Sequence, residues 1–229
     1  KDKVVVNQDN LKDYLGVQRF DYGKADKDNQ IGQVTGLAWT QVGGDLLTIE
    51  TTAVPGKGKM TSTGSLGDVM QESIQAAMTV VRSRAEKLRI NDDFYEKRDI
   101  HVHVPAGAIP KDGPSAGVAM ITAMVSLLIN IPVKEGLGMT GEISLRGHVL
   151  PIGGLKEKST AAHRAGLNHI LVPALNEKDL EDIPETVLKD LKISFIKDVS
   201  YLLKLALGID TKNISKERKT PQHTVSAEA

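Results

Sequence analysis

A serine stands in the segment PKDGPSAGVAM, residues 110–120, where a polar loop gives way to an apolar helix. Pro114 suits the first helical position, so Ser115 lies in the first turn of that helix. The unpaired N–H groups of a first turn, and the positive end of the helix dipole, stabilise an oxyanion beside the hydroxyl. The small Ala116 and Gly117 leave room for a substrate. Ser115 is therefore a candidate nucleophile, with a helix cap as the alternative interpretation.

A serine nucleophile needs a general base, and the segment GGLKEKSTAAHRAG supplies a candidate. One face of the helix predicted there carries small or apolar side chains and a single lysine, Lys158. A lysine accepts a proton only when it is neutral, and burial lowers its pKa from the usual ~10.4. Lys158 is therefore a candidate base, and a lysine that runs along the core edge to solvent is the alternative. This face comprises Leu155, Lys158, Ala161, Ala162 and Ala165.

Other catalytic and binding chemistries find little support in the sequence. There is no cysteine, which excludes disulfides, thiolate metal sites and cysteine catalysis. The segments GKGKMTST and GGLKEKST lack the spacing of a phosphate-binding loop, so no nucleotide site is predicted. His101 and His103 face the same side of a predicted strand and would make half of a metal site, but no clustered His or Cys completes it. We expect no metal, and interpret the two histidines as part of a polar strand face.

The composition is that of an ordinary globular protein, with 40% apolar and 25% charged residues. The 29 Lys and Arg residues balance 29 Asp and Glu residues, so no overall field favours nucleic acid. Aromatic residues make up 3%, too few for a platform that stacks bases. No segment is long and apolar enough for a membrane span. Neither nucleic acid nor a membrane is therefore an expected partner.

Alternating hydrophobicity predicts the strands. The segment GQVTGLAWTQVGGDLLTIETTAV predicts two strands joined at Gly43–Gly44. DIHVHVP, HILVP and ISFIKD each predict one more strand, and GMTGEISLRGHVLPIGG predicts two short strands around a turn. The glycine-rich GKGKMTSTGSLGD is expected to be a connection without regular structure.

Apolar residues at helical spacing predict the helices. One long helix covers Leu66–Leu88, and Ser65 with Asp68 resembles a capping box at its start. Further helices begin near Pro114 and span about Leu155–Ala165, and SYLLKLAL predicts the last one. Because strands and helices alternate irregularly, we predict an α/β (α+β) fold with a mixed sheet and packed helices.

The chain divides into three segments. Residues 1–30 are polar and end in a charged, glycine-punctuated stretch that indicates a linker. A globular domain is expected over residues 31–210. Residues 211–229 lack apolar periodicity and are expected to be a disordered tail. The sequence opens on KDKVVVNQDN, without a methionine or a signal peptide, so we interpret it as a piece of a longer protein or a processed product.

Several motifs resemble the proteolytic domain of Lon, a family of ATP-dependent proteases. PKDGPSAG around Ser115, MTGEISLRG from Met139 and PIGGLKEK ending at Lys158 occur in the order that the family shows. DYLGVQRFDYG and GSLGDVMQES also resemble it, and the similarity covers about residues 12–210. The resemblance implies a Lon-type proteolytic domain over residues 31–210. It implies that residues 1–30 are the tail of an upstream ATPase module and a linker.

The resemblance also implies roles for individual residues. Ser115 would be the nucleophile of a serine endopeptidase and Lys158 its general base. Thr140 would hydrogen-bond near the lysine and orient it. Asp112 and Glu142 would lie close to the site.

The resemblance further implies how the whole protein works. Backbone N–H groups of Gly113 and Ser115 would hold the oxyanion, and bond cleavage would need no metal or other cofactor in this domain. ATP and Mg²⁺ would act in the upstream module, which unfolds substrates and passes them to the proteolytic chamber. Misfolded, unfolded or regulatory proteins would be the substrates, and the assembly would be a homohexameric ring. The bacterial cytoplasm is the expected location, with the mitochondrial matrix as the alternative.

Two other functions fit parts of the sequence. A Lon-like domain of a DNA-recombination ATPase would organise a ring without cutting peptides, and the presence of both Ser115 and Lys158 argues against it. A hydrolase of small esters or amides would pair the serine with a histidine base, and its pH profile would follow an imidazole.

Overall fold

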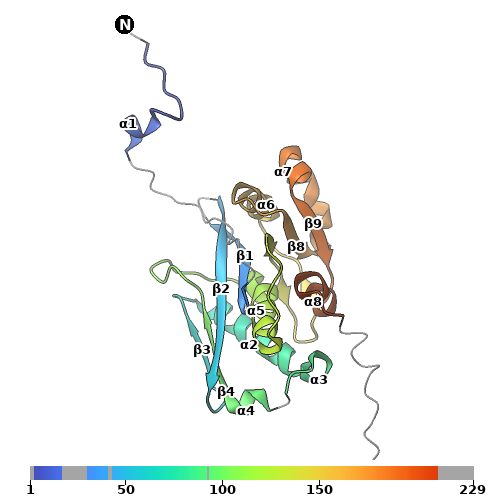
Figure 1. The fold of residues 1–229 in the computed structure, drawn as a ribbon. Coiled ribbons are helices and arrows are strands. Elements are labelled where there is room, and N and C mark those ends of the chain that lie inside the picture. Colours follow the sequence, from blue (N-terminus) through green and yellow to red (C-terminus); the bar gives the residue numbers. More distant parts are fainter. Residues whose placement is uncertain (1–2, 17–29, 41–42, 92, 211–229) are drawn as a thin grey trace, which may run out of the picture.

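The computed structural model describes residues 3–16, 30–40, 43–91 and 93–210. Within these residues, seven strands form one mixed sheet, and helices cover both of its faces (Figure 1). The predicted α/β fold with a mixed sheet and packed helices is confirmed. The expected tail, residues 211–229, and most of the expected linker lie outside the described residues.

The described strands are β1 (Gln33–Thr40), β2 (Gly43–Pro55), β3 (Met60–Thr63), β4 (Arg98–His103), β5 (Leu137–Met139), β6 (Glu142–Ile143), β7 (Val149–Leu150), β8 (His169–Pro173) and β9 (Lys192–Ile196). The large sheet has the spatial order β3-β4-β2-β1-β5-β8-β9, and β6 pairs with β7 in a separate ladder. Strand β2 is antiparallel to both of its neighbours, whereas the other neighbouring pairs described in this sheet are parallel. The carboxyl ends of β1, β5, β8 and β9 therefore lie at the same edge of the sheet.

The described helices are α1 (Leu11–Leu15), α2 (Asp68–Arg82), α3 (Ala85–Leu88), α4 (Phe94–Lys97), the 3₁₀ turn η1 (Pro114–Ala116), α5 (Gly117–Ile129), α6 (Leu155–Arg164), the 3₁₀ segment η2 (Ala174–Asp182), α7 (Glu185–Asp190) and α8 (Val199–Leu207). Helices α2, α5 and α8 share the larger apolar core, and α6 and α7 share a smaller one. Alternation along β8 separates the two, because Ile170 and Val172 belong to the smaller core and Leu171 to the larger. The two cores thus lie on opposite faces of the sheet. None of the described helices is long and apolar enough to cross a membrane.

The hairpin predicted at Gly43–Gly44 is confirmed. Strands β1 and β2 pair antiparallel from Gln33 opposite Glu50 to Thr40 opposite Gly43. The strands predicted from DIHVHVP, HILVP and ISFIKD are β4, β8 and β9, and the two short strands around a turn are β6 and β7. The turn residues 41–42 of the first hairpin lie outside the described residues.

The single long helix predicted over Leu66–Leu88 is wrong. Helix α2 ends at Arg82, and the short α3 begins at Ala85. Ala85 and Leu88 are still buried, so the apolar spacing was a true signal for burial. Apolar periodicity indicates which side chains face the core. A short break in the helix does not change this pattern when the next helical turn buries the same face.

The predicted capping box at the start of α2 is also wrong. Ser65 has a positive φ of 58°, and the residue before the helix is Gly67, which has no side chain to act as a cap. The N–H of Met70 instead donates to Asp112 Oδ1, 42 residues away in the sequence. A tertiary contact thus replaces the local cap.

The glycine-rich segment expected to lack regular structure contains β3. This strand lies at one edge of the sheet and pairs with β4 alone among the described strands. Its sequence, MTST, lacks apolar alternation because it buries little on either face. The turn before it is held by Asp99, whose Oδ1 accepts the N–H groups of Lys57 and Lys59.

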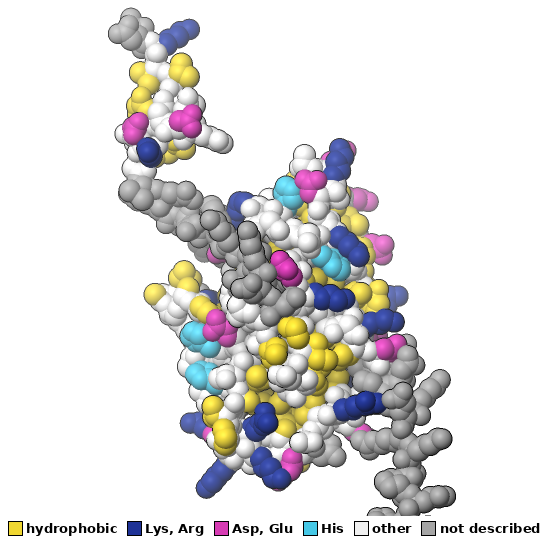
Figure 2. Space-filling model, in the orientation of Figure 1, with side chains coloured by type: hydrophobic (Ala, Val, Ile, Leu, Met, Phe, Trp, Pro, Cys, Tyr) yellow, Lys and Arg dark blue, Asp and Glu magenta, His cyan; other side chains and the backbone are white. Residues whose placement is uncertain are grey.

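Charges of both signs are interspersed over the molecular face drawn in Figure 2, where lysine and arginine lie among aspartate and glutamate. This distribution agrees with the formal net charge of zero.

Candidate active site

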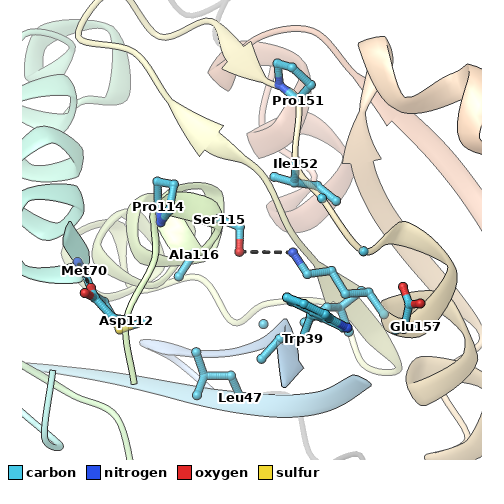
Figure 3. Close-up of a pocket in the computed structure, with 16 residues that line it drawn as sticks. Trp39, Leu47, Met70, Asp112, Pro114, Ser115, Ala116, Pro151, Ile152 and Glu157 are labelled. Atoms are coloured by element: carbon cyan, nitrogen blue, oxygen red, sulfur yellow. Dashed lines mark hydrogen bonds between the residues drawn. The ribbon is translucent and has the colours of Figure 1, made fainter. Parts of the chain in front are cut away.

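Ser115 and Lys158 meet although they come from opposite faces of the sheet. Ser115 lies in η1, directly before α5 of the larger core, and Lys158 lies in α6 of the smaller core. Lys158 Nζ donates to Ser115 Oγ at 3.1 Å (Figure 3). The contact is possible because β5 ends at Met139, so the two helices meet beyond the carboxyl end of a central strand. This edge is where open α/β sheets commonly hold their sites.

Helix α6 approaches the sheet closely because glycine lies beneath it. A Cβ on Gly44 of β2 would collide with the Glu157 carbonyl oxygen of α6. Gly154, the residue before α6, has a left-handed φ of 70° and packs against Trp39. This packing holds Lys158 at 2% exposure, which decides for the buried base over a side chain that runs along the core edge to solvent.

Burial lowers the pKa of Lys158 from 10.5 to about 8. The cause is desolvation of the ammonium group, which disfavours the charged form. A substantial fraction of Lys158 is therefore neutral at mildly alkaline pH, whereas an exposed lysine would be charged.

Thr140 links the lysine to the serine. Its hydroxyl is fully buried, accepts from Lys158 Nζ at 3.1 Å and donates to the Ser115 carbonyl oxygen at 3.2 Å. Because the hydroxyl has one proton and gives it to Ser115 O, it remains an acceptor for Lys158. One N–H of the amine is thereby directed at Thr140, and the remainder of the amine faces Ser115 Oγ.

Asp112 anchors the loop before Ser115. Its Oδ1 accepts from the N–H of Met70 at 2.9 Å and from the N–H of Gly113 at 2.8 Å. A Cβ on Gly67 would collide with the Asp112 carboxyl, so glycine is needed at the start of α2. Asp112 therefore ties the serine loop to α2. In this structure the N–H of Gly113 points at Asp112 and not into the site.

The segment around Ser115 differs locally from the expected α-helical turn. Ser115 lies in the 3₁₀ turn η1, after Gly113 with a φ of 123°, and α5 begins at Gly117. Ser115 O also accepts the N–H of Gly141 at 2.8 Å, which fixes the turn to the chain after β5. Glu142 follows as the first residue of β6, and it does not line the pocket in the described structure.

A pocket of about 640 Å³ opens beside the two side chains. Figure 3 shows Trp39 and Glu157 on the lysine side and Asp112 and Met70 beyond Pro114 on the serine side. In the described residues, β1 pairs with β5 at Thr35 and Gly36 alone, so Leu37, Ala38 and Trp39 border the pocket without a strand on that side. The lining residues are Gly36, Leu37, Ala38, Trp39, Leu47, Met70, Asp112, Pro114, Ser115, Ala116, Pro151, Ile152, Gly153, Gly154, Glu157 and Lys158.

The described histidines do not line this pocket. His101 and His103 both contact Thr63 Oγ1, at 2.8 and 2.7 Å, on the polar face of β3 and β4. His163 pairs with Asp190, and His169 contacts Ser194. The described part of the chain contains no group of three or more His, Cys, Asp or Glu side chains placed to hold a metal. His223 lies outside the described residues.

Sequence reasoning missed two residues of the pocket region. Trp39, the sole tryptophan, is 60% exposed and lies over Gly154. That it is the one tryptophan of the chain is a signal that sequence reasoning could have used. Asn176 is 2% exposed and bonds both backbone groups of Ile152 in the pocket wall. A single asparagine carries no comparable sequence signal.

Comparison with known proteins gives a consistent result. Residues 5–209 match the family described as the Lon protease (S16) C-terminal proteolytic domain. The chain is 68% identical over 216 residues to the Lon protease of Vibrio parahaemolyticus, covering 94% of this chain and 28% of that protein. It is 69% identical over 204 residues to the Lon protease of Escherichia coli K12, covering 89% of this chain and 26% of that protein.

A third relative, the Lon protease of Haemophilus influenzae, is 60% identical over 231 residues, which cover 99% of this chain and 29% of that protein. The chain thus spans between a quarter and a third of the length of these curated relatives. The family match covers most of the chain and agrees with the mixed sheet and the pocket described above. The chain therefore belongs to the Lon protease (S16) C-terminal proteolytic domain family and is a peptidase domain.

Proposed function

We propose that this chain cleaves peptide bonds with a Ser115–Lys158 dyad, as the proteolytic domain of an ATP-dependent Lon protease. The observation that carries the proposal is a buried lysine with a lowered pKa, whose Nζ lies 3.1 Å from a serine Oγ at the wall of a pocket. A structural role alone gives no reason to bury an ammonium group against two hydroxyls, because burying a charge without an anionic partner costs free energy.

The dyad works through Lys158, which takes up one proton and releases it in each half of the reaction. Neutral Lys158 takes the proton of Ser115 Oγ, and the oxygen attacks the peptide carbonyl carbon. Lys158, now an ammonium, returns the proton to the leaving amine as the peptide bond breaks. Lys158 then takes a proton from a water molecule that attacks the ester on Ser115, and passes this proton to Ser115 Oγ as the ester bond breaks and the carboxylic acid product leaves. None of these steps requires a metal or a cofactor.

The oxyanion of the tetrahedral intermediate lies beside η1 in this proposal. We assign the N–H of Ser115, which belongs to the same residue as the nucleophile, as one donor. The N–H of Gly113 becomes a second donor only if it leaves Asp112 Oδ1, which it contacts in this structure. Substrate binding would then include a small rotation of the Gly113 peptide unit. Asp112 would still accept the N–H of Met70 and so continue to anchor the loop.

The substrate is an extended peptide. The pocket borders β1 from Leu37 to Trp39, where β5 no longer pairs with it. An unpaired strand edge binds an extended backbone by main-chain hydrogen bonds, which depend little on the peptide's sequence. Folded proteins do not present such a backbone, so this domain acts on unfolded segments.

The complete protein adds functions that lie outside this chain. We place ATP and Mg²⁺ in an upstream module that unfolds misfolded and regulatory proteins, and we place residues 1–30 at its junction with the proteolytic domain. The relatives are named Lon proteases and are bacterial. We extend to the complete protein the homohexameric ring and the bacterial cytoplasm that the resemblance implies. The family match favours proteolysis over the scaffold role in DNA recombination.

Hydrolysis of an unfolded casein-like protein and of a short fluorogenic peptide, by this chain without nucleotide, tests the proposal. Ser115→Ala should abolish both activities and leave the circular dichroism spectrum and Tm unchanged, because it removes one hydroxyl. Added ATP should change neither rate nor Tm. Activity that persists in Ser115→Ala would refute the nucleophile, and a pH profile centred near the pKa of an imidazole would favour a histidine base.

A further inference from the structure

We propose that Asn176 is a positioning residue that clamps the pocket wall formed by residues 151–154. This inference rests on the proposed function, because the wall matters only if a peptide binds beside Ser115. Asn176 lies in η2, outside the pocket, and is 2% exposed. Its side chain reaches the wall from behind.

The Asn176 side-chain amide makes three hydrogen bonds, one through Oδ1 and two through Nδ2. Oδ1 accepts the Ile152 N–H at 3.0 Å, and Nδ2 donates to the Ile152 carbonyl oxygen at 2.8 Å. The second Nδ2 proton goes to Asp179 Oδ2 at 2.6 Å. The amide therefore pairs with both backbone groups of one residue, as a neighbouring β-strand would.

The clamped segment has no regular secondary structure of its own. Pro151, Ile152, Gly153 and Gly154 connect β7 to α6, and all four line the pocket. Two glycines in succession give this connection a large conformational freedom, and a Cβ on Gly153 would meet no neighbour within 4 Å. A fixed position for Ile152 therefore requires an external partner, which Asn176 provides.

Each wall of the pocket is held by a side chain that bonds to backbone groups. On the serine side, the carboxylate of Asp112, itself a residue of the serine loop, accepts the backbone N–H groups of Gly113 and Met70. On the lysine side, Asn176 binds the backbone of Ile152. The amide is suited to the second position because it must donate as well as accept, which a carboxylate cannot do.

The clamp acts on substrate binding more than on the base. Lys158 has its own restraints, namely its burial, Thr140 and the packing of α6 on Gly44. Loss of the clamp therefore raises KM by about tenfold, the order of effect of a small misplacement at a binding wall, and leaves kcat within about threefold. The pH at which activity rises as Lys158 loses its proton should not change.

The experiment compares Asn176→Ala, Asn176→Asp and Asp179→Ala in this chain. Asn176→Asp has nearly the same size but places an oxygen against the Ile152 carbonyl, so it should resemble Asn176→Ala. Asp179→Ala keeps both bonds to Ile152 and should leave KM within about twofold, which makes it the matched control. Hydrogen exchange of the Ile152 amide should accelerate in both Asn176 variants and not in Asp179→Ala.

A second control separates positioning from stability. Thr51→Val removes a buried hydroxyl whose single proton lies between two acceptors, Gly32 O at 2.9 Å and Ala123 O at 3.0 Å. It should lower Tm to a degree comparable with Asn176→Ala, with KM unchanged.

Each outcome decides the inference. An unchanged KM in Asn176→Ala, an equal rise of KM in Thr51→Val, or a shifted pH profile in Asn176→Ala would each overturn it. If the wild-type chain cleaves no peptide, the proposed function fails. The exchange rate of the Ile152 amide still decides the clamp in that case, because an unaccelerated rate in Asn176→Ala would refute it.

Discussion

Two lysines on either side of the pocket differ in the groups that surround their amines. Lys111 Nζ donates to three carbonyl oxygens, of Gly64, Ala106 and Ile109, at 3.0, 2.7 and 3.0 Å. Lys158 Nζ donates to two hydroxyls, of Ser115 and Thr140. Burial lowers the pKa of both lysines, and only for Lys158 is the effect large.

The difference shows how one residue type serves structure in one region and chemistry in the other. Carbonyl oxygens only accept, so three of them match the three N–H donors of the Lys111 ammonium group and leave no donor for a neutral amine. Hydroxyls both donate and accept, so they remain partners when Lys158 loses its proton. Lys111 thus pins the loop that leads to Ser115, and Lys158 is free to exchange a proton with it.

The largest expected effect is the difference in peptidase activity between a Lys158 variant and a Lys111 variant. Lys158→Met should lower kcat/KM for a fluorogenic peptide by about 10⁴-fold, the order seen when a dyad or triad member is removed. Lys111→Met should stay within about tenfold of the wild type. Lys158→Arg should not restore activity, because a guanidinium group does not act as a base. Equal losses at both positions would erase the distinction.

The next effect is on stability, and its sign follows from the lowered pKa. Between pH 8 and 10.5 the unfolded chain binds the Lys158 proton more tightly than the folded chain, so stability rises with pH in that window. The shift corresponds to about 3 kcal/mol. Lys158→Met should therefore be more stable than the wild type at pH 7, and the difference should shrink toward pH 10.5. Urea unfolding across this pH range measures it, and a destabilised Lys158→Met at pH 7 would contradict the burial cost.

The pH dependence of peptide cleavage should follow Lys158 and not Lys111. Because the neutral amine is the base, activity should rise about tenfold per pH unit below a pKa of about 8 and level off above it. In Lys111→Met this rising part of the pH profile, its alkaline limb, should stay at the same pH. A limb that moves in Lys111→Met, or lies below pH 7 in the wild type, would assign the titration to another group.

The smallest expected effect sharpens the role of the hydroxyl partner. Thr140→Val removes the acceptor of one Lys158 N–H bond, so kcat should fall by about tenfold, the equivalent of one hydrogen bond to a charged group. Loss of the acceptor disfavours the ammonium form, so the alkaline limb should move to lower pH. Thr122→Val, a buried hydroxyl that bonds Val118 O within α5, is the matched control. Equal kcat values for these two variants would remove Thr140 from the site.

Much of the local structure was predictable from the sequence. Alternation predicted β1, β2, β4 and β8, and the small apolar stripe of α6 made Lys158 the candidate for a buried lysine. The errors came at element ends and edges. The break after Arg82 and the edge strand β3 depend on what packs against them, and neither alters the hydrophobic pattern.

The sequence by itself determined the candidates, namely a serine at the start of an apolar helix and a lysine on an apolar stripe, because backbone preference and periodicity are properties of adjacent residues. Tertiary structure alone decided that these two side chains lie 3.1 Å apart. It also decided that Asp112 caps α2 and that Asn176 holds Ile152. The physical reason is that a hydrogen bond depends on the position of both partners. These positions follow from how two helices pack on opposite faces of one sheet and meet where β5 ends.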